Sequence, residues 1–326
     1  MTSSLTMIDT RKLHHYVDAQ TLQQALAPAL LTHPNFSGLQ VELIDSTAST
    51  NSDLLQRARQ NIMASHATNQ DQAILLLAEA QTAGRGRLGR QWHSQLGQTL
   101  TFSLALPWHA PLQQLSGASL LVGLALARTL QCLRNAQTNH ANQHATLHAV
   151  QAPDADITLK WPNDVLYQGR KLSGILVEVA KSTQASSCHC VIGIGINLQA
   201  PAPLAQSDTT NQVLPTAGID ELFNDALLEP DSATLLAMLM IEILKDWQIF
   251  SHAGWAPFVE EWQNYNHHAN RPVSIWLDGK NLHNGICRGI NAQGGLLLET
   301  AQGNQTIVSG DLADPSNSQY SLRSLA

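Results

Sequence analysis

The 326-residue sequence lacks the marks of several large protein classes. Its four cysteines show no paired spacing of a disulfide framework, so a reducing cytoplasm is the expected compartment. The polar N-terminus has no apolar core of the kind a signal peptide needs. A net charge of -7 disfavours a protein that binds nucleic acid through its overall charge. With 44% hydrophobic and 13% charged residues, the composition is that of a globular protein.

Long hydrophobic runs are also scarce. The most apolar stretch, residues 115–133, contains Ser116, Ser119 and Arg128. It is shorter and more polar than a membrane span, so it predicts a buried helix and no membrane association.

Common catalytic motifs are missing. No G-x-x-x-x-G-K-[ST] occurs, so a P-loop would not hold ATP. Neither G-x-S-x-G nor H-E-x-x-H occurs, which argues against a serine hydrolase and a zinc protease. Cys188-His189-Cys190 is a poor metal site, because in a strand the histidine points away from the two sulfurs and no second pair completes a tetrahedron.

Acidic residues are absent between Glu79 and Asp154, although the protein as a whole is acidic. The same stretch holds five arginines: Arg85, Arg87, Arg90, Arg128 and Arg134. We expect this segment to handle a small anion, and a solvated basic loop is the alternative interpretation.

Apolar runs and alternating patterns predict an α+β fold. Strands are expected at 41–44, 73–78, 99–106, 157–161, 174–179 and 190–198, with a tight turn at Gln168-Gly169. Helices are expected at 115–133, at 232–250 after a cap at Asp231 or Ser232, and at 255–266. Ser49-Thr50-Asn51 offers capping side chains for another helix.

The same patterns predict three parts of the chain. Residues 1–40 form a helical lead-in and residues 41–270 the main domain. Residues 271–326 form a small β-barrel, with short strands at 273–277, 286–290, 295–299 and 306–308 between Gly and Asn turns. Residues 135–156 and 200–230 are expected to be inserted surface loops.

The segment GRGRLGRQW, residues 84–92, combines glycines with arginines. It satisfies G-x-G-x-x-G, but a strand rather than a helix follows, and no acid appears about twenty residues on, so a dinucleotide fingerprint is rejected. Glycines let backbone N–H groups approach an anion, and guanidinium forks clamp carboxylate or phosphate oxygens. We expect a loop that is mobile when empty and ordered when an anion binds.

The segment from Lys160 to Glu178, KWPNDVLYQGRKLSGILVE, predicts a hairpin with Asp164 near Lys171 across its base. The acid is suited to hold Mg²⁺ or orient an amine, and the lysine to neutralise a phosphate; a surface salt bridge is the alternative. In GIGIN, Gly193 and Gly195 allow close approach of a ligand, or of a packed helix, and Asn197 can bind an amide or ribose hydroxyl.

Together these segments resemble the biotin–protein ligase family. The matching pieces, in family order, are Asp45-Ser46-Thr47 with Ser49-Thr50-Asn51, AEAQTAGRGRLGRQW, KWPNDVLYQGRKLSGILVE and VIGIGINL. The resemblance runs from about residue 40 to the C-terminus. It implies a mixed sheet flanked by helices, as in class II synthetase-like catalytic domains, followed by an SH3-like β-barrel.

The resemblance also implies residue roles. It assigns the biotin pocket to Ser49, Thr50, Asn51, Gln81 and Gly193, with further contacts to biotin from Arg85, Gly86, Arg87 and Lys171. It assigns the ATP and adenylate side to Arg87, Trp92, Asn163, Lys171 and Asn197. The expected catalytic residues are Lys171, Arg85, Arg87 and Asp164, the last near Mg²⁺ or the acceptor lysine.

The implied reaction uses biotin, ATP and Mg²⁺, makes biotinyl-5'-AMP, and transfers biotin to a lysine of a biotin carboxyl-carrier domain. Only about 45 residues precede the first motif, without a recognition-helix pattern, so a monofunctional ligase that does not bind DNA is expected. A homodimer is left open. Leu88 departs from the basic residue that many members carry. The alternatives are a lipoate or octanoyl ligase of the same fold and a non-catalytic biotin-binding regulator.

Overall fold

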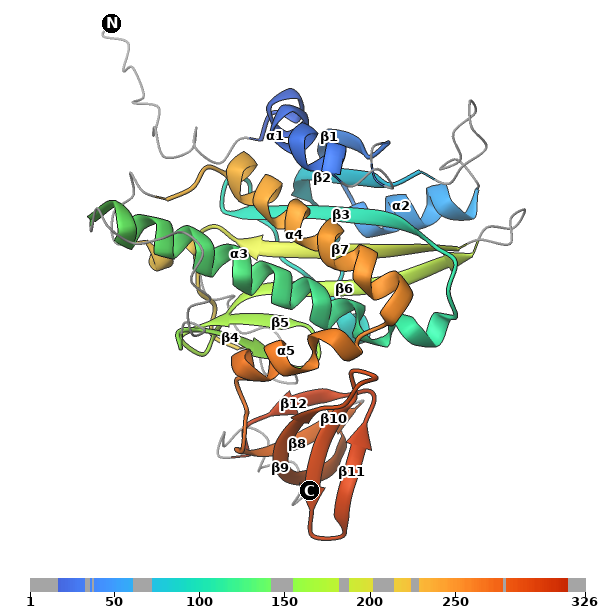
Figure 1. Cartoon of the computed structure of the whole chain (residues 1–326), viewed down its shortest axis with the longest axis vertical. Coiled ribbons are helices and arrows are strands. Elements are labelled where there is room, and N and C mark those ends of the chain that lie inside the picture. The colour runs from blue at the N-terminus through green and yellow to red at the C-terminus, as the bar shows by residue number, and fades with distance from the viewer. Residues whose placement is uncertain are drawn as a thin grey trace, which may run out of the picture.

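The computed structural model describes residues 17–32, 36, 38–60, 72–141, 155–181, 188–201, 214–223, 229–277 and 280–315. Among these residues it has two β-sheets, one of seven strands and one of five. Helices flank the larger sheet, and the smaller sheet lies at one end of the molecule (Figure 1).

The larger sheet has the strand order β1-β2-β3-β7-β6-β5-β4. Its strands are β1 (Gln40–Thr47), β2 (Ile74–Gln81), β3 (Thr99–Trp108), β4 (Ile157–Lys160), β5 (Asp164–Tyr167), β6 (Arg170–Lys181) and β7 (Cys188–Asn197). β1 and β2 are parallel, and every other neighbouring pair is antiparallel. The expected mixed sheet is therefore confirmed.

The four-residue strand β5 was not predicted as a separate strand. Gln168 and Gly169 both adopt positive φ, 48° and 75°, which suits the tight turn that joins β5 to β6. This turn places Arg170 opposite Tyr167 and Gly174 opposite Asp164.

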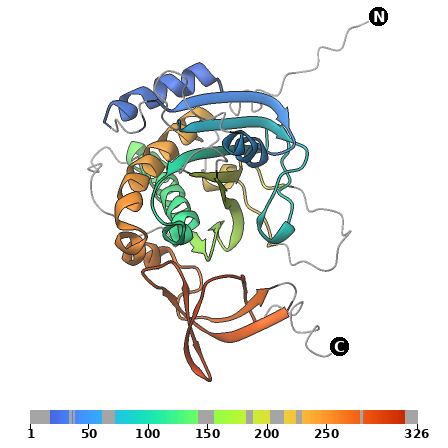
Figure 2. The same cartoon turned by 90° about the vertical axis from the view of Figure 1, so that its right-hand side faces the viewer.

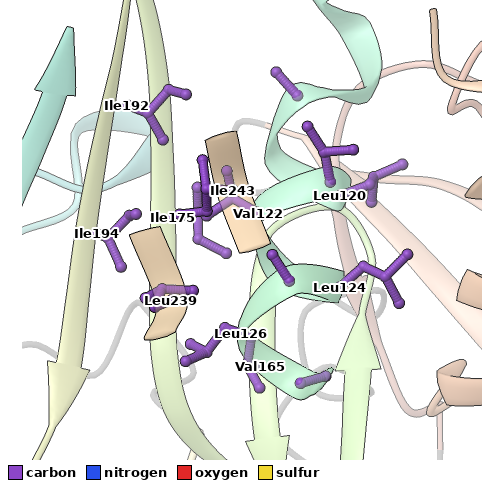
Figure 3. Close-up of a cluster of buried hydrophobic side chains, with 14 of the residues drawn as sticks. Leu120, Val122, Leu124, Leu126, Val165, Ile175, Ile192, Ile194, Leu239 and Ile243 are labelled. Carbon is purple, nitrogen blue, oxygen red and sulfur yellow. The ribbon is translucent and has the colours of Figure 1, made fainter. Parts of the chain in front are cut away.

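The two faces of the sheet are covered unequally. Helices α1 (Ala19–Thr32), α3 (Ala118–Ala141) and α4 (Ser232–Ala253) lie over one face, and α2 (Thr50–Arg59) lies over the other (Figures 1 and 2). The main core fills the first interface, where leucines of α3 and α4 meet isoleucines of β6 and β7 (Figure 3). A smaller apolar cluster, including Leu54 and Leu55, lies under α2.

Strand alternation decides which side chains face α2. In β7, Ile192, Ile194 and Ile196 enter the main core, so Gly193 and Gly195 face the opposite side. With no side chains there, Asn51 and Trp92 pack directly against this face of the sheet. This side carries the candidate site.

Helix starts follow the predicted caps. Ser49 caps α2 by accepting a hydrogen bond from the Ser52 amide, and Asp231 caps α4 by accepting one from the Thr234 amide. The expected helix near 255–266 is present as a short turn followed by α5 (Val259–Tyr265).

The smaller sheet has the order β11-β10-β9-β8-β12 and is antiparallel throughout. Its strands are β8 (Pro272–Leu277), β9 (Lys280–Ile290), β10 (Leu296–Thr300), β11 (Gly303–Ile307) and β12 (Asp311–Ala313). This agrees with the expected small β module. β12 escaped the sequence patterns because it is only three residues long.

The expectation of wholly looped inserts is wrong in part. α3 continues to Ala141, into the first insert, and the second contains a short helical turn at Ile219–Leu222 whose Ile219 and Leu222 are buried. Residues 142–154, 202–213 and 224–228 lie outside the described part of the chain.

The apolar helix expected at 115–133 is the core helix α3. Within the described residues, the segment Leu112–Ala136 is long and apolar enough to cross a membrane, but 78% of its apolar window is buried inside the protein. Its hydrophobicity is therefore explained by packing between the sheet and α4.

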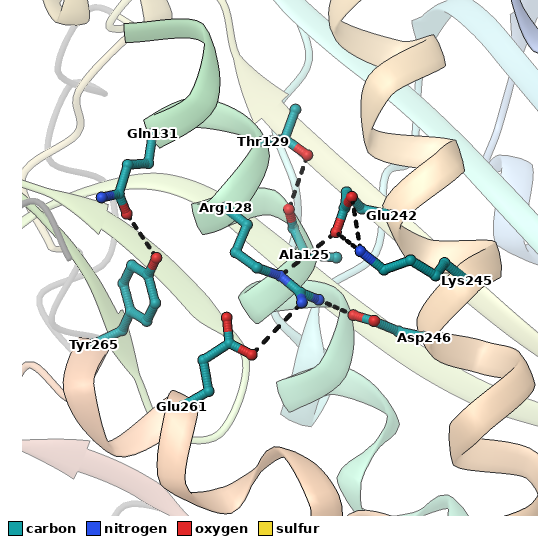
Figure 4. A network of polar contacts seen from close by, with 9 residues as sticks. All are labelled: Ala125, Arg128, Thr129, Gln131, Glu242, Lys245, Asp246, Glu261 and Tyr265. Atoms are coloured by element: carbon teal, nitrogen blue, oxygen red, sulfur yellow. Dashed lines mark hydrogen bonds and ion pairs between the residues drawn. The ribbon is translucent and has the colours of Figure 1, made fainter. Parts of the chain in front are cut away.

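Two of the five arginines in the acid-free stretch serve the fold rather than an anion. Arg128 forms ion pairs with Glu242 and Asp246 of α4 and Glu261 of α5 (Figure 4). Arg134 pairs with Asp156 at 3.3 Å. Acids distant in sequence but close in space neutralise both guanidinium groups, and both lie outside the loop at 84–92, where the other three arginines stand.

Candidate active site

A polar cluster lies where α2 begins beside the sheet. The Thr50 amide donates to Gln81 Oε1 at 2.8 Å, and the Thr50 hydroxyl lies 2.7 Å from the Ser103 hydroxyl. Ser103 donates to Asn51 Oδ1 at 2.7 Å, and Asn51 Nδ2 donates to Glu178 Oε2 at 3.0 Å. Thus Thr50 and Asn51 from one predicted segment and Gln81 from another form one hydrogen-bonded group, with the cap residue Ser49 buried beside them.

Gly193 lies directly under this cluster, and its lack of a side chain leaves room for Asn51. A Cβ at this position would lie 2.5 Å from Asn51 Oδ1. The sequence could not distinguish a close ligand from a packed helix here, and the structure shows that the start of α2 fills the space.

The loop at 84–92, called the lid below, closes on itself as a small hairpin. Its ends pair through Arg85 and Gln91, and the Trp92 amide donates to the Gly84 carbonyl at 2.9 Å. Inside it, the Gly86 amide donates to the Arg90 carbonyl at 2.7 Å. That the lid is mobile when empty stays a prediction.

The two lid arginines assigned to catalysis point to different partners. Arg85 pairs with Glu178 at 2.8 Å, on the side of the Asn51 cluster. Arg87 donates to Asn163 Oδ1 at 3.3 Å, on the side of the hairpin. Burial lowers the pKa of Arg87, while the nearby carboxylates of Asp311 and Asp164 oppose that change.

Asp164 lies between two ammonium groups. Its carboxylate is 2.7 Å from Lys171 Nζ and 3.8 Å from Lys160 Nζ, and its side chain is 11% exposed. Burial alone would raise the pKa of Asp164, but Lys171 and Lys160 outweigh it and hold that pKa below the usual range. Burial also lowers the pKa of Lys160, against the opposing effect of Asp164. The predicted proximity of Asp164 and Lys171 is confirmed.

This arrangement does not fit Asp164 as a magnesium ligand, because both oxygens already face cations. Among the described residues, no group of three or more His, Cys, Asp or Glu side chains could hold a metal ion.

Trp92 and Asn197 lie next to Lys171 of the β5–β6 hairpin. The Lys171 ammonium lies 5.9 Å from the centre of the Trp92 ring, and a Cβ at Gly195 would lie 2.2 Å from that ring. Asn197 Nδ2 donates to the carbonyls of Lys171 and Ala217, both at 3.2 Å. Asn197 thus holds the backbone of Lys171, and direct contact between Asn197 and a nucleotide stays a prediction.

Sequence reasoning assigns no role to Ser103, Glu178, Lys160 and Asp311, which the structure places at the site. Ser103 and Glu178 could have been found from strand alternation, since each faces the α2 side of its strand. Asp311 gives no such signal, because it comes from the smaller sheet.

Comparison with known proteins decides the family. The model of the biotin/lipoate A/B protein ligase family matches residues 44–197, and that of the biotin protein ligase C terminal domain matches residues 268–312. The chain belongs to the biotin/lipoate A/B protein ligase family. The first match holds the polar cluster, the lid and the hairpin, and the second holds most of the smaller sheet.

Two curated members of the family show the extent of the similarity. The bifunctional ligase/repressor BirA of Escherichia coli is 34% identical over 224 residues, which are 68% of this chain and 60% of that protein. The biotin--[acetyl-CoA-carboxylase] ligase of Mycobacterium tuberculosis is 28% identical over 309 residues, which are 94% of this chain and 98% of that protein.

Solved structures of the family support the fold. The biotin protein ligase of Aquifex aeolicus, in complex with biotin and ATP, has a TM-score of 0.59 and 24% identity. The alignment covers 84% of this chain and 97% of that one. Its mixed sheet with flanking helices is the architecture found here.

Proposed function

We propose that this protein is a biotin–protein ligase that makes biotinyl-5'-AMP from biotin and ATP and transfers biotin to a lysine of a biotin carboxyl-carrier domain. The observation that carries the proposal is the convergence of Arg87, Asn163 and Lys171 from the lid and the hairpin, next to the polar cluster around Asn51. An amide-like ring fits the cluster, and phosphates fit the cations.

The first step joins two anions. The biotin carboxylate oxygen attacks the α-phosphorus of ATP, a P–O bond forms, and the bond to pyrophosphate breaks. Lys171 and Arg87 stabilise the charge that develops on the phosphoryl oxygens, and each well-placed donor contributes about 3 kcal/mol to the transition state. Asp164 holds Lys171 in position.

The second step needs no nucleophile from the enzyme. The carrier lysine, as a free amine, attacks the acyl carbon of the adenylate; AMP leaves with the bonding electron pair, and the amine loses a proton. The closed lid keeps water away from the mixed anhydride until the carrier arrives. Because this reaction uses ATP and carrier proteins, we propose that the protein acts in the cytoplasm.

One assay tests the proposal. The protein is mixed with biotin, Mg-ATP and an apo carboxyl-carrier domain, with pyrophosphate release followed and the carrier weighed by mass spectrometry. One biotinyl group per carrier is expected. Lipoate attachment in place of biotin would favour a lipoate or octanoyl ligase, and biotin binding without pyrophosphate release would favour a non-catalytic regulator. The match to the biotin protein ligase C terminal domain supports the first outcome.

We also propose that the chain works without binding DNA. The matched part covers only 60% of the E. coli ligase/repressor, so the comparison does not carry the repressor role across. A gel-shift titration with operator DNA tests this, and saturable, sequence-specific binding would refute it.

A further inference from the structure

The smaller sheet is anchored to the body of the protein by uncharged hydrogen bonds. The Trp161 indole N–H donates to the Gly294 carbonyl at 3.0 Å, and the Ser116 hydroxyl donates to the Gln293 carbonyl at 2.6 Å. Both contacts reach the turn between β9 and β10, and neither involves the lid.

A separate contact joins the smaller sheet to the lid. Asp311, the first residue of β12, forms an ion pair with Arg90. The two residues are 221 positions apart, and the Asp311 side chain is only 15% exposed. β12 lies on the side of the smaller sheet that faces the larger one (Figure 1).

The backbone at Asp311 is constrained by the strands next to it. It pairs with Trp276 of β8, and the preceding Gly310 has a φ of 138°, which other residues rarely adopt. A Cβ at Gly310 would also lie 2.8 Å from Ile275 Cγ2. The backbone that carries the Asp311 side chain is therefore held in one conformation where it meets the lid.

Arg90 is coupled to Arg87 through the backbone of the lid. The Arg90 amide donates to the Arg87 carbonyl at 3.1 Å across a single short turn. Because this turn is so tight, a displacement of Arg90 displaces Arg87, whose guanidinium donates to Asn163 at the candidate adenylate side.

We propose that Asp311 is a positioning residue of the active site: it holds Arg90, and through the turn of the lid it sets the place of Arg87 over the nucleotide. We call the Arg90–Asp311 ion pair the latch. The identity of the nucleotide rests on the proposed ligase function, whereas the contact between the latch residues does not. The carboxylate also acts at longer range, since its charge raises the pKa values of Arg87 and Lys160 against the lowering effect of burial.

A purely structural ion pair would behave differently. Arg288 and Glu299 form a pair at 2.6 Å on β9 and β10 of the same sheet, and both side chains are about half exposed. Such pairs contribute little to stability. Glu299→Gln therefore serves as the matched control: it removes one carboxylate charge from the same sheet without touching the lid.

The first test needs no substrate. Amide hydrogen exchange is measured over residues 84–92 in the full-length wild type, Asp311→Asn and Glu299→Gln. We expect exchange there to be about fivefold faster in Asp311→Asn, because a surface ion pair that closes a loop contributes roughly that factor, and unchanged in Glu299→Gln. Equal exchange in all three proteins, or equal acceleration in both variants, overturns the latch.

The second test follows the adenylate. With biotin and Mg-ATP, Asp311→Asn should lose biotinyl-adenylate about fivefold faster and show a raised KM for ATP, while Glu299→Gln should change neither. Asp311→Glu keeps the carboxylate and should restore retention of the adenylate. The double variant Arg90→Asp with Asp311→Arg exchanges the two charges and should also restore it. If Asp311 served folding alone, the charge exchange would not restore retention. Unchanged retention in Asp311→Asn contradicts the proposal. A wild type that makes no adenylate contradicts the ligase function, and hydrogen exchange still decides the latch.

Discussion

Removing the Asp164 carboxylate should destabilise the protein strongly, because it leaves two ammonium groups facing each other. Lys160 and Lys171 keep only 14% and 27% of their side chains exposed, so solvent screens their repulsion poorly. Breaking a buried ion pair from one side costs about 3–5 kcal/mol, and the partial exposure of Lys171 places Asp164→Ala near the lower end, about 3 kcal/mol.

Urea unfolding followed by circular dichroism measures this loss. Asp156→Ala is the matched control, since Asp156 is 40% exposed in its pair with Arg134 and should cost under about 1 kcal/mol. Adding Lys160→Met to Asp164→Ala should recover about 1 kcal/mol by removing one of the two cations. A loss below about 1 kcal/mol in Asp164→Ala, or no recovery in the double variant, would refute the electrostatic reasoning.

Acid gives an independent check on the same residue. The pKa of Asp164 is lowered in the folded protein, so its contribution to stability is complete above the pKa of the unfolded chain and is lost as pH falls through the folded value. The gap in unfolding free energy between wild type and Asp164→Ala should therefore be constant near neutral pH and shrink below about pH 4. A gap that widens in acid would have the wrong sign.

Three further predictions concern the reaction. Lys171→Ala should slow adenylate formation more than about tenfold while the protein stays folded; a wild-type rate of pyrophosphate release would remove Lys171 from the mechanism. Arg87→Ala should speed the escape of the adenylate, measured by chase with unlabelled biotin, and an unchanged off-rate would count against the lid. Gly195→Ala places a methyl 2.2 Å from the Trp92 ring and should raise the KM for ATP most, whereas Gly193→Ala should raise the KM for biotin most; equal effects on both would contradict the assignment of the two sides.

Local features of the site were predictable from the sequence because their causes are local. Apolar runs and alternation gave β2, β3 and β7, and short polar side chains before helical patterns gave the caps at Ser49 and Asp231. The turn at Gln168-Gly169 was enough to predict that Asp164 and Lys171 meet.

Features that depend on the closure of the whole fold were not predictable. Arg85 and Arg128 both stand in the acid-free segment, but Glu178 lies beside the first and Asp246 beside the second only after the sheet and helices pack. Likewise, nothing near Asp311 in the sequence indicates that it meets a loop from the other end of the chain. The density of arginines along the sequence therefore identified the basic loop at 84–92. Only the fold shows that Arg128 and Arg134 instead form ion pairs that hold helices and loops together.

The site carries an excess of positive charge that bound anions would neutralise. On the hairpin side of the site, among the described residues, Arg87, Arg90, Lys160 and Lys171 lie near the two carboxylates of Asp164 and Asp311. The surplus of positive charge is part-buried, so under the proposed function bound anions would lower its electrostatic cost. A carboxylate and a triphosphate would supply this negative charge and stabilise the lid. Under the proposed ligase function the adenylate keeps one phosphate after pyrophosphate leaves, so part of the negative charge that stabilises the lid stays in place until AMP departs.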